Sequence, residues 1–489
     1  MPIYTSFMKN PLGIVLVILL GTLLRIVNLL SDKAFWDDEL FSVLLARKPF
    51  WDFLYGVVAD THPPGHLLLL HFFHSVLGDA NWVYRLPSVL AACALIIVVF
   101  LLARELFEKS SALLASFLVA ISPFFIQLSN EARSYSLATL VITFMSYSLI
   151  KSLRTSDTIW YRVYLISAIL GVYIDHFAWI WLLMLNLFLV GKKMFGRFSQ
   201  IHIRIFLYGL PALGLTVYQV LFSSTSIIRP VVYQQRATQS CFAVVKKIFA
   251  VLWHAATGYG YSGWSKESLS IYSAEPWFWV AVAAYASFLI SVILAVLKAR
   301  KELSLFVFFS SIAPMALLSI LFPKVLEARY VSFTVPLLFI FAAAGFRYLK
   351  YRSIGLLPLI IVSLYFTFKV LAMPWDPIHR DDPRTALDYT FRIAGENDVV
   401  CGLVHQVEYY GPKEKKTHYY RYLQDIDFNR RYHRIFLLEP PLYVDPVKDR
   451  TRLDAAQSFL ARQGYELTES IDFTKNGVYT FVHIFEPGS

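Results

Sequence analysis

The sequence predicts an α-helical protein that crosses a membrane many times and carries a small C-terminal α/β domain. Two observations predict the membrane class: 57% of the 489 residues are hydrophobic and only 16% are charged, whereas a soluble domain has roughly a quarter charged residues. The mean hydropathy of +0.53 agrees with this class. Over the first three quarters of the chain, apolar runs recur that are long enough for a hydrocarbon core of roughly 30 Å.

Hydropathy along the chain predicts about eleven membrane-spanning helices. The profile defines the ends of several of them only to within a few residues. The first helix has the length of a membrane anchor and lacks the small-residue cleavage site of a signal peptide. The predicted spans lie near residues 11–30, 86–104, 111–129, 135–150, 163–175, 177–191, 205–222, 277–297, 303–322, 331–346 and 354–372.

Basic residues gather in alternate connections between these spans, which is the pattern of loops that stay in the cytoplasm. They include Arg104, Lys151, Lys192, Lys298 and Arg347. The pattern predicts a multi-pass protein of the cell (inner) membrane with a cytoplasmic N-terminus and a periplasmic or extracellular C-terminal domain. It also accounts for the formal charge of +11, so we do not expect nucleic acid as a partner.

The predicted transmembrane domain covers residues 1–373 and contains two large segments on the outer side. Residues 31–85 form the first outer loop, in which we expect juxtamembrane helices. Residues 223–274 mix Lys with Trp and Tyr, which favours either an interfacial helix or a loop packed on the body.

Residues 374–489 alternate helical and strand patterns, which predicts a small extracytoplasmic α/β domain. The three cysteines form no spacing motif; Cys241 and Cys401 could pair, but free thiols are favoured. The predicted helices lie near 384–394 and 452–462, and the predicted strands near 399–404, 434–438, 465–471 and 478–485.

Three consecutive acids, Asp37, Asp38 and Glu39, follow the first span. A carboxylate at this depth loses part of its hydration, which costs free energy unless the group is paired or functional. The alternative is a structural cap, in which Asp37 or Asp38 accepts backbone N–H groups at the start of a helix.

A second polar segment reads Asp60-Thr61-His62-Pro63-Pro64, and its two prolines stiffen the loop that carries the acid and the histidine. Its alternative is a plain turn before the amphipathic run that follows. We expect His66, His71 and His74 on that run to pack or to lie at the interface, because no carboxylate joins them at metal-ligand spacing.

Further polar groups interrupt apolar sequence at later outer junctions. Each group alone could be an interfacial ion pair or a snorkelling flank residue. Together they gather at one membrane face, which indicates a site. They are Glu131, Arg133 and Tyr135, then Asp175 and His176, and finally Lys324, Glu327 and Arg329.

The order of these motifs, "FWDDELFS", "DTHPP", "RLPSVL", "SPFFIQLSNEARSYSL" and "PKVLEARYVSFTVP", resembles the C-type membrane glycosyltransferases. The likeness is to bacterial relatives of protein O-mannosyltransferases and lipid A aminoarabinose transferases, and it extends from about residue 11 to residue 372. It implies transfer of a monosaccharide from a polyprenyl phosphate to an acceptor outside the cytoplasm, a lipid, glycan or protein, with inversion. Membrane lipids are the other expected partners.

The resemblance also implies roles for single residues. Asp38 resembles the catalytic base of this family, with Asp37 as the alternative register and Glu39 as a supporting acid. Residues 31–85 would then form the catalytic outer loop. The residues implied to bind the donor phosphate are His62, Arg133, Lys324, Arg329 and Arg25. The implied supporting residues are Asp60, Glu131, Tyr135, Asp175 and His176.

No cofactor is expected, although Asp60 could support a divalent cation if further ligands joined it. Two other functions compete. A transporter or flippase of lipid-linked sugars would place charges near mid-membrane and often shows repeated halves; here the charges gather at one face and we find no repeat. A receptor or assembly subunit would depend on the outer domain instead.

Overall fold

The computed structural model describes residues 12–60, 62–155, 157–193, 195–222, 241–257, 276–321, 328–349, 352–372, 383–412, 417–420, 422–439, 446–473 and 481–488. The chain forms two units. The helical unit contains the residues up to Leu30 and Leu45–Ala372, and the α/β unit contains Ser31–Leu44 and Met373–Ser489. The predicted domain boundary after residue 373 lies beside the end of the helical unit, but the structure adds residues 31–44 to the α/β unit.

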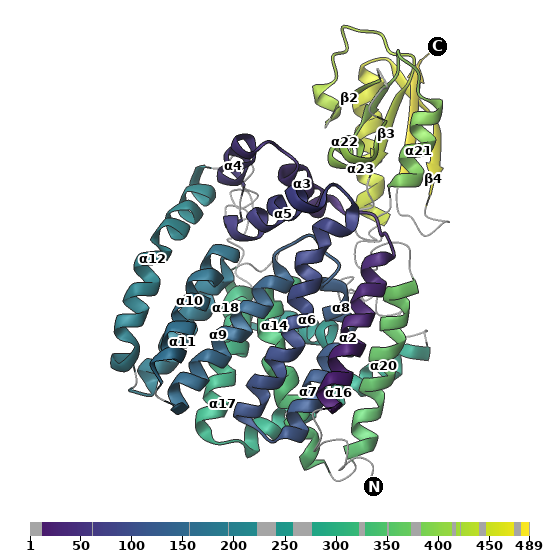
Figure 1. The fold of residues 1–489 in the computed structure, drawn as a ribbon. Helices are drawn as coiled ribbons and strands as arrows, with labels where there is room; N and C mark the ends of the chain where they lie inside the picture. Colours follow the sequence, from purple (N-terminus) through teal and green to yellow (C-terminus); the bar gives the residue numbers. More distant parts are fainter. Residues whose placement is uncertain are drawn as a thin grey trace. The chain divides into compact units, whose positions relative to one another are not determined.

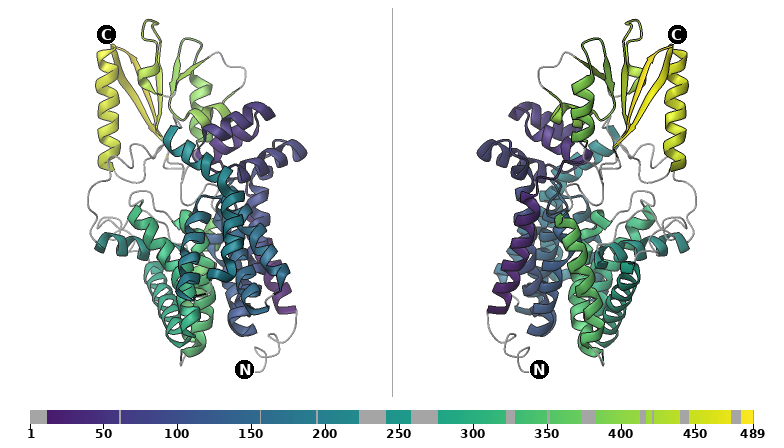
Figure 2. Two further views of the ribbon diagram at one scale, coloured as in Figure 1. Left: turned by 90° about the vertical axis from the view of Figure 1, so that its left-hand side faces the viewer. Right: turned by 90° about the vertical axis from the view of Figure 1, so that its right-hand side faces the viewer.

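The long helices of the helical unit run alongside one another, whereas the short helices α4 and α5 run across them (Figures 1 and 2). Helix α3 (Asp37–Ala46) begins in the α/β unit and ends in the helical unit. The other helices are α2 (Leu12–Leu30), α4 (Phe50–Ala59), α5 (Pro64–Leu77), α6 (Asn81–Leu106), α7 (Lys109–Ile121), α8 (Pro123–Leu128), α9 (Tyr135–Thr155), α10 (Thr158–Ile174), α11 (Phe177–Gly191), α12 (Phe195–Phe222), α14 (Cys241–Thr257), α16 (Pro276–Lys298), α17 (Lys301–Val307), η1 (Phe308–Ile312), α18 (Ala313–Leu321), η2 (Ala328–Thr334), α19 (Val335–Gly345), η3 (Phe346–Tyr348) and α20 (Arg352–Ala372).

Eight helical stretches within the described residues are long and apolar enough to cross a membrane, so the predicted polytopic class is confirmed. They match eight of the eleven predicted spans. The other three, near 111–129, 163–175 and 177–191, form shorter apolar helices, and the total of eleven stays a prediction. The first of these is divided because Pro123 holds Ser122 in an extended conformation, which ends α7 before α8 begins.

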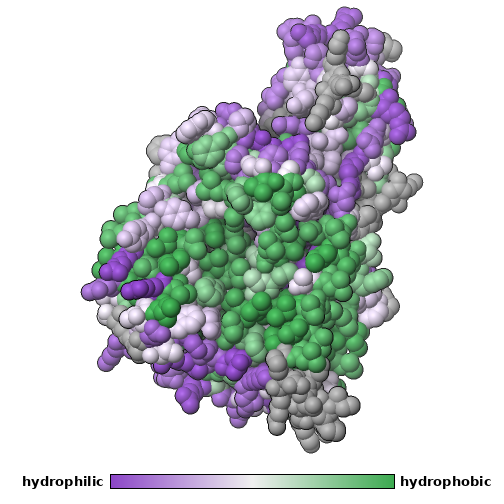
Figure 3. Space-filling view, in the orientation of Figure 1, coloured by the Kyte–Doolittle hydropathy of each residue, from purple (hydrophilic) through white to green (hydrophobic). Residues whose placement is uncertain are grey.

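Apolar side chains are divided between a buried centre and an exposed band. Helix α19 is buried along its whole length, as expected for a helix that is hydrophobic on all sides. At Gly345, an added Cβ atom would lie 1.7 Å from the carbonyl oxygen of Ser291, so only glycine allows this approach of α19 to α16. Leu19, Leu23 and Leu90 are more than half exposed, and Figure 3 shows a broad hydrophobic band over the helical unit. Lipid tails can cover such a band.

The two ends of the helical unit carry different loops. One end collects predicted cytoplasmic residues in ion pairs, such as Lys151 with Glu105 at 2.6 Å and Arg347 with Glu108 at 3.0 Å. Helix α9 runs from this end to Tyr135, a rise of roughly 30 Å at about 1.5 Å per residue. The loop before Tyr135 therefore lies at the opposite end, and His62, Asp175 and Arg329 contact this loop or the Tyr135 ring.

The two segments predicted on the outer side contain helices. Helices α4 and α5 lie between the first two spans, and Trp51 and Tyr55 on α4 are 77% and 81% exposed, which suits juxtamembrane helices. In 223–274 the structure describes α14, whose second half is buried, at Val251 and Trp253 for example. This favours packing on the body for that half; residues 223–240 and 258–274 lie outside the described residues.

The α/β unit contains a five-stranded sheet of order β2-β1-β3-β5-β4. The first three strands of this order are parallel, and β5 pairs antiparallel with β3 and β4. Helices cover both faces of the sheet (Figure 2). The elements are α21 (Arg384–Ile393), β1 (Val399–Cys401), α22 (Val404–Tyr410), β2 (His418–Tyr420), η4 (Leu423–Asp425), β3 (Ile435–Glu439), α23 (Pro446–Arg462), β4 (Tyr465–Asp472) and β5 (Phe481–Pro487).

Alternation along the strands divides the core of this unit in two. Val400 and Phe436 face α21 and α22, whereas Val399 and Ile435 face α23, because successive side chains of a strand point to opposite faces. The predicted α/β class is confirmed, but β2 and α22 had no clear signal in the sequence. Cys401 is buried and carries a free thiol, as favoured.

Candidate functional site

Hydrogen bonds join Asp60, His62 and Arg133 in the helical unit. His62 Nδ1 lies 3.2 Å from Asp60 Oδ2, and His62 Nε2 lies 2.9 Å from Arg133 Nη2. Asp60 is the C-cap of α4, and α5 begins at Pro64. Arg133 comes from the loop before α9. The tertiary structure thus brings together two of the polar segments that the sequence singles out.

The direction of these hydrogen bonds determines which nitrogen of His62 carries the proton. A guanidinium group can only donate, so His62 Nε2 accepts from Arg133. The proton of the neutral imidazole then lies on Nδ1, which donates to the Asp60 carboxylate. Asp60 therefore orients the ring of His62, and that ring in turn orients the guanidinium group of Arg133.

A second guanidinium group, that of Arg329 in η2, contacts the same aromatic ring as Arg133. The Cζ atoms of Arg133 and Arg329 lie 6.0 Å and 5.9 Å from the centre of the Tyr135 ring, within the range of cation–π attraction. The two arginines are only 7% and 6% exposed. We call Asp60, His62, Arg133, Tyr135 and Arg329 the arginine cluster. Its buried positive charges suit an anion, because charge-assisted hydrogen bonds strengthen where water is excluded.

Side chains on neighbouring helices hold the loop that carries Arg133. Ser88 on α6 is fully buried and donates to the carbonyl oxygens of Glu131 and Arg133, at 2.6 and 3.2 Å. Ser134 Oγ donates to Asp175 Oδ2 at 3.0 Å. Asp175 also accepts from the backbone N–H of Phe177 at 3.0 Å. Two predicted supporting residues, Glu131 and Asp175, thus lie in or against this loop.

The other parts of the arginine cluster are held in a similar way. Thr139 Oγ1 on α9 donates to Ser332 Oγ at 2.8 Å, which joins α9 to the 3-10 helix of Arg329. Gln219 near the end of α12 is fully buried, and its amide donates to the carbonyl oxygens of Val57 and His62, at 3.0 and 3.1 Å. Neither Gln219 nor Ser88 stands out in the sequence, because their functions depend on helices far apart in the chain.

His66 is a further member of this neighbourhood, although the sequence suggests only packing or an interfacial place for it. Its side chain on α5 is 4% exposed. Burial lowers its pKa to about 3, with Arg133 and His62 as smaller causes. His66 is therefore neutral at physiological pH. Within the described part of the chain, its Nε2 atom finds no hydrogen-bond partner.

The acidic segment lies in the α/β unit. Glu39 is fully buried, and its Oε2 atom accepts from the backbone N–H of Trp36 at 3.4 Å. Because α3 begins at Asp37, this is the return half of a capping box. A cap was the structural alternative for the acids, but Glu39 provides it. Asp38 is half-buried. The side chain of Asp37 lies outside the described residues.

Arg25 and His176 have partners outside the arginine cluster. Arg25 is fully buried, and its guanidinium group donates to the carbonyl oxygens of Gly21, Val119 and Ala120, at 2.9 to 3.2 Å. Val119 and Ala120 belong to the last turn of α7, whose carbonyl oxygens lack helical partners. The structure thus gives Arg25 a helix-closing contact instead of a place in the cluster. His176 Nδ1 lies 3.0 Å from Thr216 Oγ1 on α12.

Two other predictions concern Lys324 and metal binding. Lys324 and its neighbour Glu327 lie outside the described residues. In the described ranges, no three His, Cys, Asp or Glu side chains are grouped so that they could hold a metal ion. Asp60, the suggested metal ligand, instead accepts from His62.

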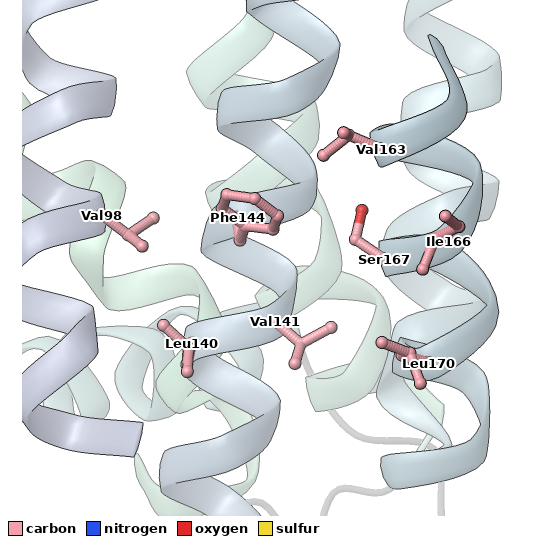
Figure 4. A pocket seen from close by; sticks show the side chains of 8 residues that line it. All are labelled: Val98, Leu140, Val141, Phe144, Val163, Ile166, Ser167 and Leu170. Atoms are coloured by element: carbon pink, nitrogen blue, oxygen red, sulfur yellow. The ribbon is translucent and has the colours of Figure 1, made fainter. Parts of the chain in front are cut away.

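An apolar groove of about 330 Å³ lies between α6, α9 and α10 (Figure 4). Its lining contains no charged side chain, and its one hydroxyl, that of Ser167, donates to the carbonyl oxygen of Tyr164 at 3.0 Å. None of the lining residues belongs to the arginine cluster, and such an apolar lining suits hydrocarbon. The eight lining residues are Val98, Leu140, Val141, Phe144, Val163, Ile166, Ser167 and Leu170.

Part of the chain matches a known family in sequence. Residues 61–223 match the family model described as dolichyl-phosphate-mannose-protein mannosyltransferase. Over 160 residues the chain is 24% identical to "Putative mannosyltransferase YkcB" of Bacillus subtilis (strain 168). This match covers 31% of the chain and 22% of the length of YkcB.

Two solved structures share the fold over 96% of the chain. The crystal structure of ArnT from Cupriavidus metallidurans bound to undecaprenyl phosphate has a TM-score of 0.58 and 12% identity, and covers 96% of this chain and 97% of ArnT. The apo structure of ArnT gives a TM-score of 0.57 with 11% identity and the same coverage. These matches agree with the resemblance drawn from the sequence: over residues 61–223 the chain is similar to a family of protein mannosyltransferases, and it shares the fold of ArnT.

Proposed function

We propose that this protein transfers a monosaccharide from a polyprenyl phosphate to an acceptor on the outer side of the membrane. Support comes from the family match over residues 61–223, which contain His62 and Arg133. ArnT, whose fold the chain shares, was crystallised with undecaprenyl phosphate. The observation that carries the proposal is the arginine cluster, because two buried guanidinium groups suit the phosphate of such a donor.

In the proposed reaction, the hydroxyl oxygen of the acceptor attacks the anomeric carbon of the sugar. The bond from that carbon to the phosphate oxygen breaks, and its electron pair leaves with the polyprenyl phosphate. The hydroxyl proton passes to a carboxylate, for which Asp38 is our first candidate and Asp37 the alternative. A single displacement of this kind inverts the anomeric centre.

The two groups of charged residues have different tasks in this proposal. Arg133 and Arg329, with Lys324 as a further candidate, stabilise the negative charge that develops on the departing phosphate. His62 orients Arg133, and Glu39 keeps the acidic helix in register. No general acid is needed, since a phosphate leaves readily without a proton, and we propose a reaction without a cofactor.

We also propose how the protein is placed in the cell. The protein lies in the inner cell membrane. Its N-terminus and the end with the Lys151–Glu105 ion pair face the cytoplasm, because basic residues gather in the loops on that side. The arginine cluster and the α/β unit then lie outside the cytoplasm. A donor carried by a membrane lipid suits this side, where nucleotide sugars are not expected. The acceptor is a lipid, glycan or protein that bears a free hydroxyl group.

The test uses the full-length protein in liposomes with polyprenyl phosphate mannose, labelled in the sugar, as the first donor. We expect the label to leave the lipid and polyprenyl phosphate to appear once an envelope extract supplies the acceptor. Mass spectrometry of envelope lipids, glycans and proteins, with and without the protein, then identifies the molecule that gains one sugar mass.

The same liposomes separate a transferase from a flippase. Movement of intact labelled lipid between the leaflets, without loss of sugar, would contradict the proposal. Other polyprenyl phosphate sugars are tried in parallel, so that the identity of the sugar does not decide the outcome. Asp38→Asn protein, inserted at the same level, provides the inactive control.

A further inference from the structure

We propose that the C-terminal domain positions the acidic segment, and that helix α22 does so through Tyr410, Tyr409 and His405. This inference rests on the proposed function, because it assigns a task to the domain within that reaction. It begins from the grouping of residues 31–44 with the α/β unit. The segment that carries Asp38 therefore folds with a domain whose sequence begins more than 300 residues later.

The contacts between α22 and the segment are specific. The backbone N–H of Phe35 donates to the hydroxyl of Tyr410 at 2.8 Å. The Phe35 ring, which is fully buried, meets the Tyr409 ring edge-on at 5.6 Å. Phe41 meets the ring of His405 edge-on at 6.0 Å. His405 and Tyr409 are four residues apart and so share one face of α22.

These contacts lie on both sides of the acids. Phe35 precedes Asp37 by two residues, and Phe41 follows Glu39 by two. A further contact lies upstream, where Arg384 Nη1 of α21 donates to the carbonyl oxygen of Asp32 at 3.1 Å. Since the segment is held before and after Asp38, the contacts limit both the translation and the rotation of the first turn of α3.

The place of α22 in the sheet supports this role. Strand β1 has β2 on one side and β3 on the other, all parallel, and α22 begins directly beyond the carboxyl end of β1. In open α/β sheets this point, where the strand order reverses, is where ligands bind. Gly402 makes the turn with φ 96°, and a Cβ there would lie 2.2 Å from the carbonyl oxygen of Leu438. The helix at this edge thus binds a segment of its own chain.

Loss of these contacts should shift the position of Asp38 and leave donor binding unchanged. Phe35 and Trp36 are consecutive, and their N–H groups are bound to Tyr410 and Glu39. Loss of the first bond frees the chain immediately before α3. A displacement of about 1 Å at a reacting group can lower a rate about a hundredfold. Tyr410 is therefore a positioning residue, which acts through the backbone of the segment.

The test compares Tyr410→Phe with Tyr419→Phe in the full-length protein. Both variants lose one tyrosine hydroxyl of the same domain, but Tyr419 lies on β2 and is 48% exposed. For Tyr410→Phe we expect kcat to fall about tenfold to a hundredfold, with KM for the polyprenyl phosphate sugar unchanged. Tyr419→Phe keeps both constants. An unchanged kcat for Tyr410→Phe, or a change in KM alone, would overturn the inference.

Hydrogen exchange provides a readout that does not depend on activity. In Tyr410→Phe, we expect the amides of residues 31–44 to lose about tenfold of their protection, while α6 and α9 keep theirs. Unchanged protection of these amides would show that Tyr410 does not hold residues 31–44 against α22. Lost protection with an unchanged kcat would refute the role of the segment in catalysis. If the native protein shows the docking but consumes no donor, the proposed function fails and the structural contact stands.

Discussion

The helical unit and the α/β unit each hold one group of charged residues, but by different means. In the helical unit, the arginine cluster depends on hydrogen bonds from α6, α9 and α12, so many helices share in placing it. In the α/β unit, the acidic segment depends on a cap within itself and on one short helix, α22. Groups with different supports can be disabled separately. Under the proposed function, a substitution in the α/β unit should affect proton removal. A substitution in the helical unit should affect phosphate binding.

The sharpest test of this division is the exchange of a single carboxylate for an amide. Asp38→Asn removes the proposed base without changing the size of the side chain. General base catalysis contributes about a hundredfold to ten-thousandfold, so we expect kcat to fall by that factor with KM for the donor nearly unchanged. Asp37→Asn is the matched control. Equal activity of both variants would reject the assignment of the base.

Loss of one guanidinium group tests the role of the arginine cluster in the helical unit. For Arg133→Gln we expect kcat/KM to fall about a hundredfold to a thousandfold, as for other donors that stabilise a developing anion, and KM to rise as well. Donor binding and turnover at several donor concentrations separate the two effects. Arg104→Gln, an exposed arginine at the opposite end of the helical unit, is expected to behave like the native protein.

A third variant separates structure from catalysis within the helical unit. Arg25→Met leaves the carbonyl oxygens of Val119 and Ala120 without their partner, and unsatisfied buried groups cost about 1–3 kcal/mol. We therefore expect a lower unfolding temperature in detergent and an unchanged kcat for the protein that remains folded. A large loss of kcat at an unchanged unfolding temperature would instead restore Arg25 to phosphate binding.

The smallest expected effect concerns His66 and pH. The folded pKa of about 3 lies below the value of about 6.5 for an unfolded chain. Below pH 6.5 the unfolded state binds a proton that the folded state does not, so stability falls as the pH falls towards 3. At pH 5 the loss is roughly 2 kcal/mol. His66→Gln should lose less stability than the native protein between pH 7.5 and 5, as measured by thermal unfolding in detergent. Equal losses in both proteins would contradict a buried, neutral His66.

The elements that the sequence predicted well are those with a local signal. Long apolar runs predicted eleven spans, eight of which match long apolar helices. Runs typical of strands predicted β1, β3, β4 and β5. The strand β2 and the helix α22 have only three and seven residues, too few for a period to stand out. The partners of Arg25 depend on the tertiary structure, and its role in phosphate binding stays a prediction. A cation near the outer end of a span suggests phosphate binding, and only the break at Ser122 and Pro123 reveals the carbonyl oxygens that it contacts.

The composition and periodicity of this chain determined that it lies in a membrane, that its polar motifs gather at one end of the helices, and which residue types are available there. These properties follow from hydrophobicity, which acts locally along the chain. Only the tertiary structure decided that Arg133 contacts His62 across 71 residues, and that Phe35 is bound by Tyr410 across 375. Such pairs depend on how helices and domains pack, and packing is a property of surfaces that form only when distant segments meet.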